Sequence, residues 1–181
     1  MCNFEPGDTV DVDYAFVRKI DAPAAKEGNL VANGDFENGL STWIYGSDAN
    51  VASTAAAFDA EKGKVLRLTG DPANKSNAFK TVSCSLGKIE AGKYALTFSA
   101  RSAAVPGKGK LFCARVRTTN AQGRTQRYFG KPIDLSKRDW QECETVFNLD
   151  GKAADTQIYI SVQNLTAEDT VYLDNITLKK L

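Results

Sequence analysis

The sequence of 181 residues contains no histidine. Without imidazole the chain cannot form a Ser-His-Asp triad, a Cys-His nucleophile pair or any metal site with a histidine ligand. Its cysteines, Cys2, Cys84, Cys113 and Cys143, show no Cys-x-x-Cys spacing, so we do not expect a zinc or iron–sulfur site. We interpret them as free thiols, with one disulfide among the last three as the alternative.

Long apolar runs and an excess of one charge are also missing. No segment approaches the roughly 20 apolar residues of a membrane-spanning helix, and no apolar segment of a signal peptide follows Met1. The 23 basic and 22 acidic residues are mixed along the chain and give a net charge of +1. This balance does not indicate a nucleic-acid or membrane-surface partner, for which a clustered basic excess is typical.

The sequence does contain a series of short segments in which apolar and polar residues alternate. They are separated by Gly, Asn, Asp or Pro, and none has the 3.6-residue period of a helix. The predicted strands are residues 51–58, 64–69, 78–86, 93–102, 110–118, 124–133, 140–149, 156–163 and 171–179. This spacing predicts an all-β fold, a two-sheet β-sandwich, and the hydrophobic content of 43% is ordinary for one such domain.

Alternation also predicts which side chains lie in the core, because neighbouring side chains in a strand point to opposite sides. The predicted core positions are Tyr94, Leu96, Phe98, Phe112, Ala114, Val116, Cys143, Thr145, Phe147, Ile158, Ile160 and Val162. The opposite positions include Arg115, Arg117, Glu142, Tyr159 and Gln163, and we expect them to share the outer face of one sheet. Such a face is either a solvated surface or a sugar-binding cleft, because sugar hydroxyls need polar partners and sugar C–H faces need rings.

Both ends of the domain carry a motif. Residues 29–43 read NLVANGDFENGLSTW, in which a Gly-rich turn places Asp35 and Glu37 on either side of an inward Phe36. Residues 171–178 read VYLDNITL, a strand with one acidic residue between apolar ones. The pair resembles the first and last strands of the carbohydrate-binding modules of families 4, 9 and 22, which open Asn-Gly-x-Phe-Glu-x-Gly-x-x-x-Trp and close Tyr-x-Asp-x-x-x-Leu.

The resemblance implies a β-jelly-roll and a non-catalytic function. Such a module holds a catalytic glycoside hydrolase domain of the same parent chain on a β-1,4-linked plant glycan, and xylan is the glycan that we expect. It also implies an extracellular or cell-surface location, and we expect a monomer. Two other classes stay open. One is a structural or protein-interaction module in a tandem array; the other is a glycoside hydrolase or lyase that uses Glu142 and Glu144, about 7 Å apart along a strand.

The resemblance further implies a structural calcium ion that joins both ends of the chain. Its predicted ligands are the side chains of Glu37, Glu61 and Asp174 and the backbone carbonyls of Asp35 and Lys64. Exposed turn carboxylates that hold no metal are the alternative interpretation.

For the glycan, the resemblance places contacts on the polar face and on the strand that follows residue 77. The family usually has a Trp near position 78, where this chain offers Phe79 as a substitute ring. The predicted binding residues are Tyr45, Phe79, Arg115, Arg117, Arg124, Tyr128, Glu142, Tyr159 and Gln163, with Phe129 as a further stacking platform. Trp43 and Trp140 are assigned to the core, as their family counterparts are.

An internal repeat marks the N-terminal segment. Residues 7–20 align without gaps on residues 168–181 and share Asp-Thr-Val, a later Asp and a Lys. We therefore predict that residues 1–20 are the last strand of a preceding, truncated module. Residues 21–28, which are small, charged or Pro, are predicted to be a linker. The binding module is then residues 29–181.

Overall fold

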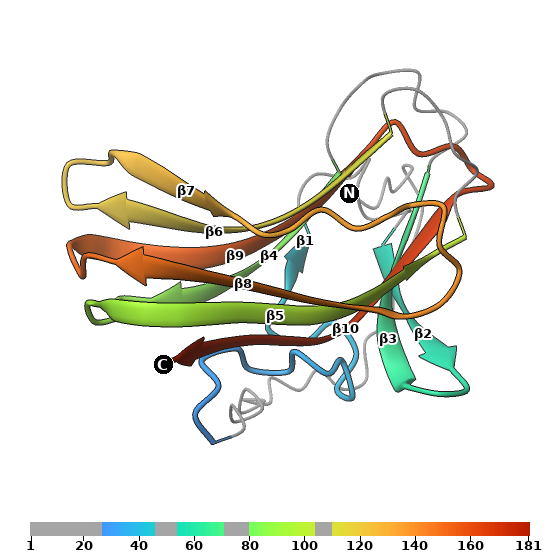
Figure 1. The fold of residues 1–181 in the computed structure, drawn as a ribbon, viewed down its shortest axis with the longest axis horizontal. Coiled ribbons are helices and arrows are strands. Elements are labelled where there is room, and N and C mark those ends of the chain that lie inside the picture. Colours follow the sequence, from blue (N-terminus) through green and yellow to red (C-terminus); the bar gives the residue numbers. More distant parts are fainter. Residues whose placement is uncertain (1–26, 46–53, 71–79, 104–109) are drawn as a thin grey trace, which may run out of the picture.

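The computed structural model describes residues 27–45, 54–70, 80–103 and 110–181. This part of the chain forms two antiparallel sheets of five strands each, which pack face to face (Figure 1). The strand predicted for residues 1–20, the linker up to residue 26 and the ring predicted at Phe79 fall outside the described residues. No helix that could span a membrane occurs in the described ranges.

Sheet 1 has the strand order β1, β4, β9, β6, β7. The bounds of its strands are Ile44–Tyr45 (β1), Lys80–Gly87 (β4), Ala153–Gln163 (β9), Leu111–Asn120 (β6) and Thr125–Phe129 (β7). Sheet 2 has the order β2, β3, β10, β5, β8. The bounds of its strands are Thr54–Asp59 (β2), Gly63–Thr69 (β3), Thr170–Lys180 (β10), Gly92–Ser102 (β5) and Gln141–Leu149 (β8). The chain crosses repeatedly between the two layers, and the predicted two-sheet β-sandwich is confirmed.

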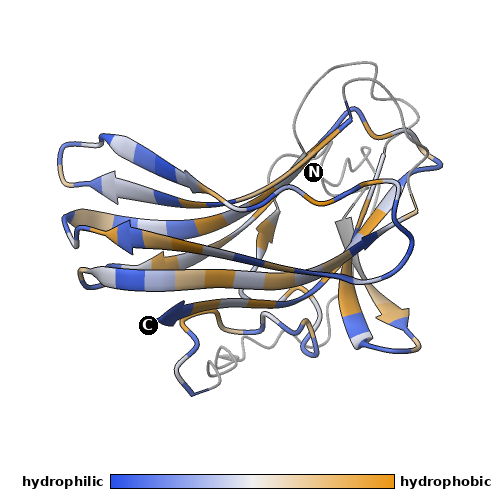
Figure 2. Ribbon diagram, in the orientation of Figure 1, coloured by the Kyte–Doolittle hydropathy of each residue, from blue (hydrophilic) through white to orange (hydrophobic). Residues whose placement is uncertain are grey.

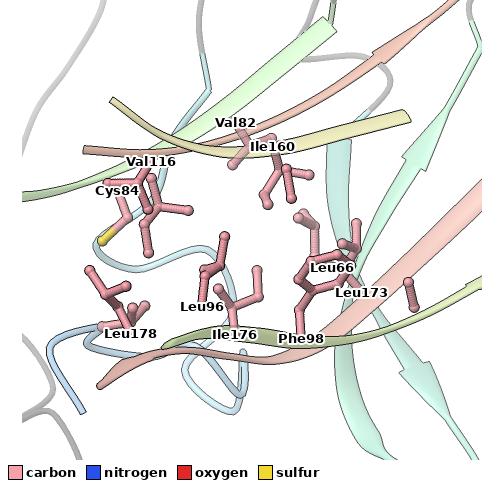
Figure 3. Packing of buried hydrophobic residues seen from close by; sticks show 14 of the residues in the cluster. Leu66, Val82, Cys84, Leu96, Phe98, Val116, Ile160, Leu173, Ile176 and Leu178 are labelled. Atoms are coloured by element: carbon pink, nitrogen blue, oxygen red, sulfur yellow. The ribbon is translucent and has the colours of Figure 1, made fainter. Parts of the chain in front are cut away.

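The inner faces of the two sheets form one hydrophobic core (Figure 3). Leu96, Phe98 and Leu173 from sheet 2 lie opposite Val116 and Ile160 from sheet 1, and none of the five is more than 1% exposed. Burying a side chain of this size stabilises the fold by roughly 1.5–3 kcal/mol. Figure 2 shows the same alternation as apolar and polar bands along the strands. The inward positions predicted for β5, β6 and β9 are confirmed.

Residues 29–43 pack along the last strand and close the sandwich. The amide of Leu30 donates to the carbonyl of Leu178 at 2.9 Å, and the amide of Ile176 donates to the carbonyl of Gly34 at 2.9 Å. A Cβ atom at Gly34 would lie 2.0 Å from that Ile176 backbone oxygen. Glycine is therefore required at position 34 for this segment to approach β10 this closely.

The Asn-Gly turn within this segment is organised by the buried side chain of Asn33. Its amide group donates to the carbonyls of Gly39 at 3.0 Å and Ser41 at 2.8 Å. The indole Nε1 of Trp43 donates to the Asn33 carbonyl at 3.0 Å, and the Trp43 ring lies 5.3 Å from the ring of Phe36 in the core. The motif thus builds the core, and the assignment of Trp43 is confirmed.

The described cysteines are free thiols. Cys84 is buried, and the loss of solvent raises the pKa of its thiol to about 11, although a hydrogen bond to Thr42 lowers it. Cys143 is half-buried, and burial raises its pKa as well. Cys113, also half-buried, lies at an outward position of β6, opposite Ser161 of β9. The three thiols therefore differ in their access to solvent reagents.

Candidate functional site

The strand register places polar and aromatic residues in rows across the outer face of sheet 1. One row contains Ile44, Ser83, Tyr159, Arg115 and Phe129, one from each strand. The next row contains Ser85, Gln157, Arg117 and Arg127. We call this surface, together with Leu111, Cys113, Asp155, Ser161 and Gln163, the arginine face. It unites Arg115, Arg117, Tyr159 and Gln163, as the sequence predicts.

Two guanidinium groups stack on one tyrosine at the centre of the arginine face. The guanidinium carbon of Arg117 lies 4.6 Å from the centroid of the Tyr159 ring, and that of Arg115 lies 5.2 Å from it. Gln157 fixes two of these groups, because its Oε1 accepts from Arg117 at 2.9 Å and from the Tyr159 hydroxyl at 2.6 Å. The cluster is therefore preorganised by contacts within the sheet.

The arginines of this cluster form no ion pair with an acidic residue in the part of the chain that the structure describes. The Nε atoms of Arg115 and Arg117 are buried and have no hydrogen-bond partner. None of the ion pairs between described residues involves either arginine. The nearest carboxylate in the register is Asp155, which accepts a hydrogen bond from Ser85 at 3.2 Å. Two guanidinium groups that form no ion pair with a described carboxylate leave this surface with unbalanced positive charge, which a polar or anionic ligand could meet.

Exposed apolar side chains flank the cluster. Phe129 is 59% exposed in the same row as Arg115, Ile44 is 60% exposed at the other end of that row, and Leu111 is 50% exposed at the end of β6. Sugars present both hydroxyl edges and apolar C–H faces, so a sugar-binding surface needs both kinds of group. The arginine face supplies both.

Two predicted binding residues were placed on the wrong surface. Tyr128 pairs with the inward Val116 and stacks on Phe147 of sheet 2 at 5.2 Å, so it belongs to the core side. Glu142 lies on β8 in sheet 2, where its carboxylate accepts from the hydroxyl of Ser99 at 2.7 Å. Alternation assigns the face of a residue within its own strand, but it does not assign that strand to a sheet, and this caused the error.

The other predicted binding residues lie apart from the cluster or cannot be placed. Arg124 lies in the turn between β6 and β7, where its amide donates to Asn120 Oδ1 at 2.9 Å. It lines a hollow at the end of the sandwich together with Asp150 and Lys152. The backbone of Tyr45 pairs with Val82 in β1, but its side chain falls outside the described residues.

The outer face of sheet 2 holds a second group of arginine and aromatic residues, with a different arrangement. The guanidinium of Arg101 lies 4.7 Å from the Tyr172 ring centroid and 5.4 Å from that of Trp140. Arg101 also forms an ion pair with the buried Asp59, and Lys62 lies 5.4 Å from the Trp140 centroid. We call this surface the tryptophan face. Trp140 therefore lies on an outer face, and its assignment to the core was wrong.

The predicted calcium ligands lie where the first described segment meets β3 and β10. Glu37 Oε1 accepts from the amide of Lys64 at 3.2 Å, and the Lys64 ammonium donates to the Glu37 carbonyl at 2.7 Å. The pKa of Asp174 is raised to about 6, mainly by burial; the Asn175 amide and Lys62 act to lower it, and Asp35 and Glu37 act to raise it. Four of the predicted ligands, Asp35, Glu37, Lys64 and Asp174, are thus neighbours.

The fit to a cation is partial. Asp174 is 2% exposed and its Oδ1 atom has no hydrogen-bond partner, which suits a site completed by a positive ion. Glu61 is exposed in the turn between β2 and β3, where its amide donates to Asp59 Oδ1 at 2.9 Å. No three acidic or sulfur side chains among the described residues lie close enough together to hold a metal. Backbone carbonyls would have to supply the other ligands.

The sequence model of a family described as a carbohydrate binding domain matches residues 28–170. This chain belongs to that family. The resemblance read from residues 29–43 and 171–178 is confirmed, and so is the non-catalytic nature of the module. The hydrolase or lyase alternative, with Glu142 and Glu144 as its acids, is therefore set aside. No curated protein matches the chain.

Solved structures of low identity share the fold of this carbohydrate-binding module. Family 16 Carbohydrate Binding Module-2 has 19% identity and a TM-score of 0.60, over 84% of this chain and 100% of that chain. The C-terminal family 22 module of Clostridium thermocellum Xyn10B has 13% identity and a TM-score of 0.58, over 81% and 89%. The CBM22-1 xylan-binding domain of Paenibacillus barcinonensis Xyn10C has 15% identity and a TM-score of 0.58, over 87% and 97%.

Proposed function

We propose that the arginine face binds a β-1,4-linked plant glycan, most simply xylan, and thereby anchors a polysaccharide-degrading enzyme. The observation that carries this proposal is the cluster of Arg115, Arg117 and Tyr159, which faces outward, forms no ion pair with a described carboxylate and adjoins the exposed ring of Phe129. Guanidinium N–H groups donate to sugar hydroxyls, and Phe129 offers an apolar surface to the sugar C–H face.

The similar structures support a linear β-linked polysaccharide as the ligand class. Two of them are described as xylan-binding domains, and a family 61 module, TmCBM61, was solved with β-1,4-galactotriose. A family 22 module was also solved together with a xylanase catalytic module and xylohexaose. By the same logic the parent chain carries a glycoside hydrolase domain and acts outside the cell or at its surface. These statements are proposals for this chain.

Affinity electrophoresis tests the proposal directly. The protein is run through gels that contain soluble arabinoxylan, glucuronoxylan, galactan or mixed-linkage glucan, and we expect xylans to retard it. Arg115→Ala and Tyr159→Ala should each reduce the retardation. Arg67→Ala is the matched control, because Arg67 is an exposed arginine on sheet 2 beside Tyr172. If no polysaccharide retards the protein, or if Arg67→Ala weakens binding as much as Arg115→Ala, the assignment to the arginine face fails.

We propose calcium as the structural ion of the fold. Asp174, Glu37 and the carbonyls of Asp35 and Lys64 would hold it, and it would neutralise carboxylates that otherwise repel one another. The buried oxygen of Asp174 without a partner supports this proposal. Elemental analysis of the purified protein after dialysis against calcium tests occupancy without reference to binding.

The proposed limits of the module can be tested by shortening the chain. Residues 29–45 are tied to β10 and β4 by hydrogen bonds, whereas residues 1–20 are proposed to be the last strand of a preceding module in a tandem arrangement. A chain that begins at Glu27 should melt at the same temperature and bind the same glycans as the full chain. A large loss of affinity in the shorter chain would assign residues 1–26 to the binding module.

A further inference from the structure

We infer that the glycan recognised by the arginine face is acidic, with carboxylate or sulfate groups that pair with Arg115, Arg117 and Arg127. The inference rests on the proposed function, namely that this face binds a polysaccharide. It concerns the chemical class of that polysaccharide, because the charge and geometry of the face suit an anion better than a neutral chain.

The charge on the face is strongly one-sided. Arg117 and Arg127 are directly opposite each other on β6 and β7, and Arg115 lies two residues from Arg117 on β6. Arg115 and Arg117 are thus about 7 Å apart along the strand, and strands lie about 4.8 Å apart. Like charges that face each other across a strand pair are destabilising. An arrangement that concentrates three positive groups this way is relieved by an anion.

Among the described residues, no carboxylate forms an ion pair with these arginines. Asp155, on the same face, lies near the start of β9 opposite Thr119, and its carboxylate accepts a hydrogen bond from the hydroxyl of Ser85 at 3.2 Å. Within the described part of the chain, no ion pair involves Arg115, Arg117 or Arg127. The whole chain has a net charge of +1. The positive charge is therefore a local property of this face and not of the molecule.

The stacking geometry favours an anion over a neutral sugar at the centre of the face. The ring of Tyr159 is already in contact with the guanidinium groups of Arg115 and Arg117. A sugar that stacked on that ring would have to displace them. A carboxylate or sulfate pairs with guanidinium groups through N–H hydrogen bonds and does not need the face of the Tyr159 ring.

The exposed apolar side chains beside the cluster suit a different part of the ligand. Phe129 and Ile44, exposed at opposite ends of the row through Tyr159, can contact C–H faces of sugars on either side of the charged group. The face is thus arranged for a chain in which an acidic sugar, or a sugar with an acidic branch, occupies the centre and neutral apolar faces lie beside it. A nucleic acid would also offer anions. However, Phe129 is the one exposed aromatic ring among the residues of the arginine face, and a single ring provides little base stacking.

Matched probes that differ only in charge test the inference. Binding is measured by isothermal titration with glucuronoxylan and with the same glucuronoxylan after chemical reduction of its carboxyl groups. Polygalacturonate and carrageenan serve as the carboxylated and sulfated probes, and a single-stranded oligonucleotide serves as the competing polyanion. We expect carboxyl reduction to weaken binding about tenfold or more, since hydrogen bonds to charged groups are the stronger ones. Raising the sodium chloride concentration should weaken binding to the acidic probe but not to the reduced one.

Variants then assign the effect to residues. Arg115→Gln and Arg127→Gln should each weaken binding to the acidic probe several-fold, and by a larger factor than they weaken binding to arabinoxylan. Arg115→Lys keeps the charge but loses the geometry for two parallel hydrogen bonds, so its affinity for the acidic probe should lie between those of the unchanged protein and Arg115→Gln. Arg67→Gln is the control on the other sheet, and thermal melting confirms that every variant is folded.

The outcomes separate the two proposals. Equal binding to native and carboxyl-reduced glucuronoxylan would overturn the acidic-glycan inference and leave the proposed function standing. Absence of binding to every polysaccharide would overturn the proposed function itself. Binding to the oligonucleotide that matches or exceeds binding to the acidic glycans would also overturn the inference. Preference for polygalacturonate or for carrageenan would support it and identify carboxylate or sulfate as the anion.

Discussion

The two outer faces of this sandwich combine the same residue types in opposite ways. On the tryptophan face, Arg101 contacts two rings and is neutralised by the buried carboxylate of Asp59. On the arginine face, Arg115 and Arg117 share one ring and form no ion pair with a carboxylate of the described residues. An arginine that is paired with a buried carboxylate stabilises the fold, whereas one whose charge is not balanced in this way can pair with an anionic ligand. Residue type alone does not distinguish the two roles.

The largest expected effect comes from breaking the ion pair between Arg101 and Asp59 on the tryptophan face. Arg101→Met leaves Asp59 buried without its counter-charge, so we expect the free energy of unfolding to fall by roughly 2–4 kcal/mol. Urea denaturation measures this loss, and glycan affinity should be unchanged while the protein is folded. Adding Asp59→Asn should restore part of the stability, because it removes the unpaired charge and keeps an oxygen for the amides of Glu61 and Lys62. Full stability of Arg101→Met would contradict a structural role for this face.

A second prediction uses two neighbouring rings on opposite sides of β7. Phe129→Ala should weaken glycan binding by about 1–3 kcal/mol, in the range of other exposed anchor residues, and leave the melting temperature nearly unchanged. Tyr128→Ala should do the reverse, because it removes the ring that stacks on Phe147. Affinity electrophoresis and thermal melting of the same two proteins provide the comparison. Exchanged outcomes would invert the faces of sheet 1.

A third, smaller effect concerns the proposed ion beside sheet 2. Calcium at ten times its dissociation constant should stabilise the protein by about 1.4 kcal/mol relative to excess chelator, a shift of roughly 3–6 °C in melting temperature. Asp174→Asn should abolish the difference, since it removes the buried carboxylate. Glu168→Gln, an exposed position before β10, is the matched control. Identical melting curves with calcium and with chelator would end the proposal.

The smallest expected effect is a protection measurement. Cys113 lies on the arginine face opposite Ser161, whereas Cys143 lies on β8 in sheet 2 and packs against the core. Saturating glycan should therefore slow alkylation of Cys113 several-fold and leave that of Cys143 unchanged, as followed by mass spectrometry of the separate peptides. Cys84 should stay unreactive in both conditions, because it is buried and its thiol pKa is about 11. Equal protection of Cys113 and Cys143 would indicate a general change in the protein rather than contact with the face.

The sequence predicts well which side chains of a strand point inward, but it predicts poorly which strands share a sheet. Alternation correctly assigns the inward positions of β5, β6 and β9, because each depends only on neighbouring residues in one strand. It places Glu142 and Arg115 on a common face, although β8 and β6 belong to different sheets. Which strands lie side by side is decided by contacts between distant segments, and a strand's own residues carry little of that information.

The binding site shows the same limit. Arg115, Arg117 and Tyr159 could be selected from the sequence, but their stacking and the role of Gln157 depend on the register between β6 and β9. The family resemblance predicts Trp140 in the core, as its family counterparts are. Trp140 lies on the outer face of sheet 2, where Arg101 and Lys62 cover its ring. These two residues come from β5 and from the turn before β3, so this contact depends on segments distant in sequence.

The pairing of residues 29–34 with β10 also determines when this module can finish folding. β10 is the middle strand of sheet 2, between β3 and β5, and its residues 176–178 hold the first described segment in place. During synthesis, β3 and β5 are therefore made long before the strand that joins them, and their inner edges have no partner until the last residues emerge. Contacts between segments this distant in sequence slow folding. Until β10 has been synthesised, the unpaired edges of β3 and β5 can pair with other chains, so the incomplete module is prone to aggregate.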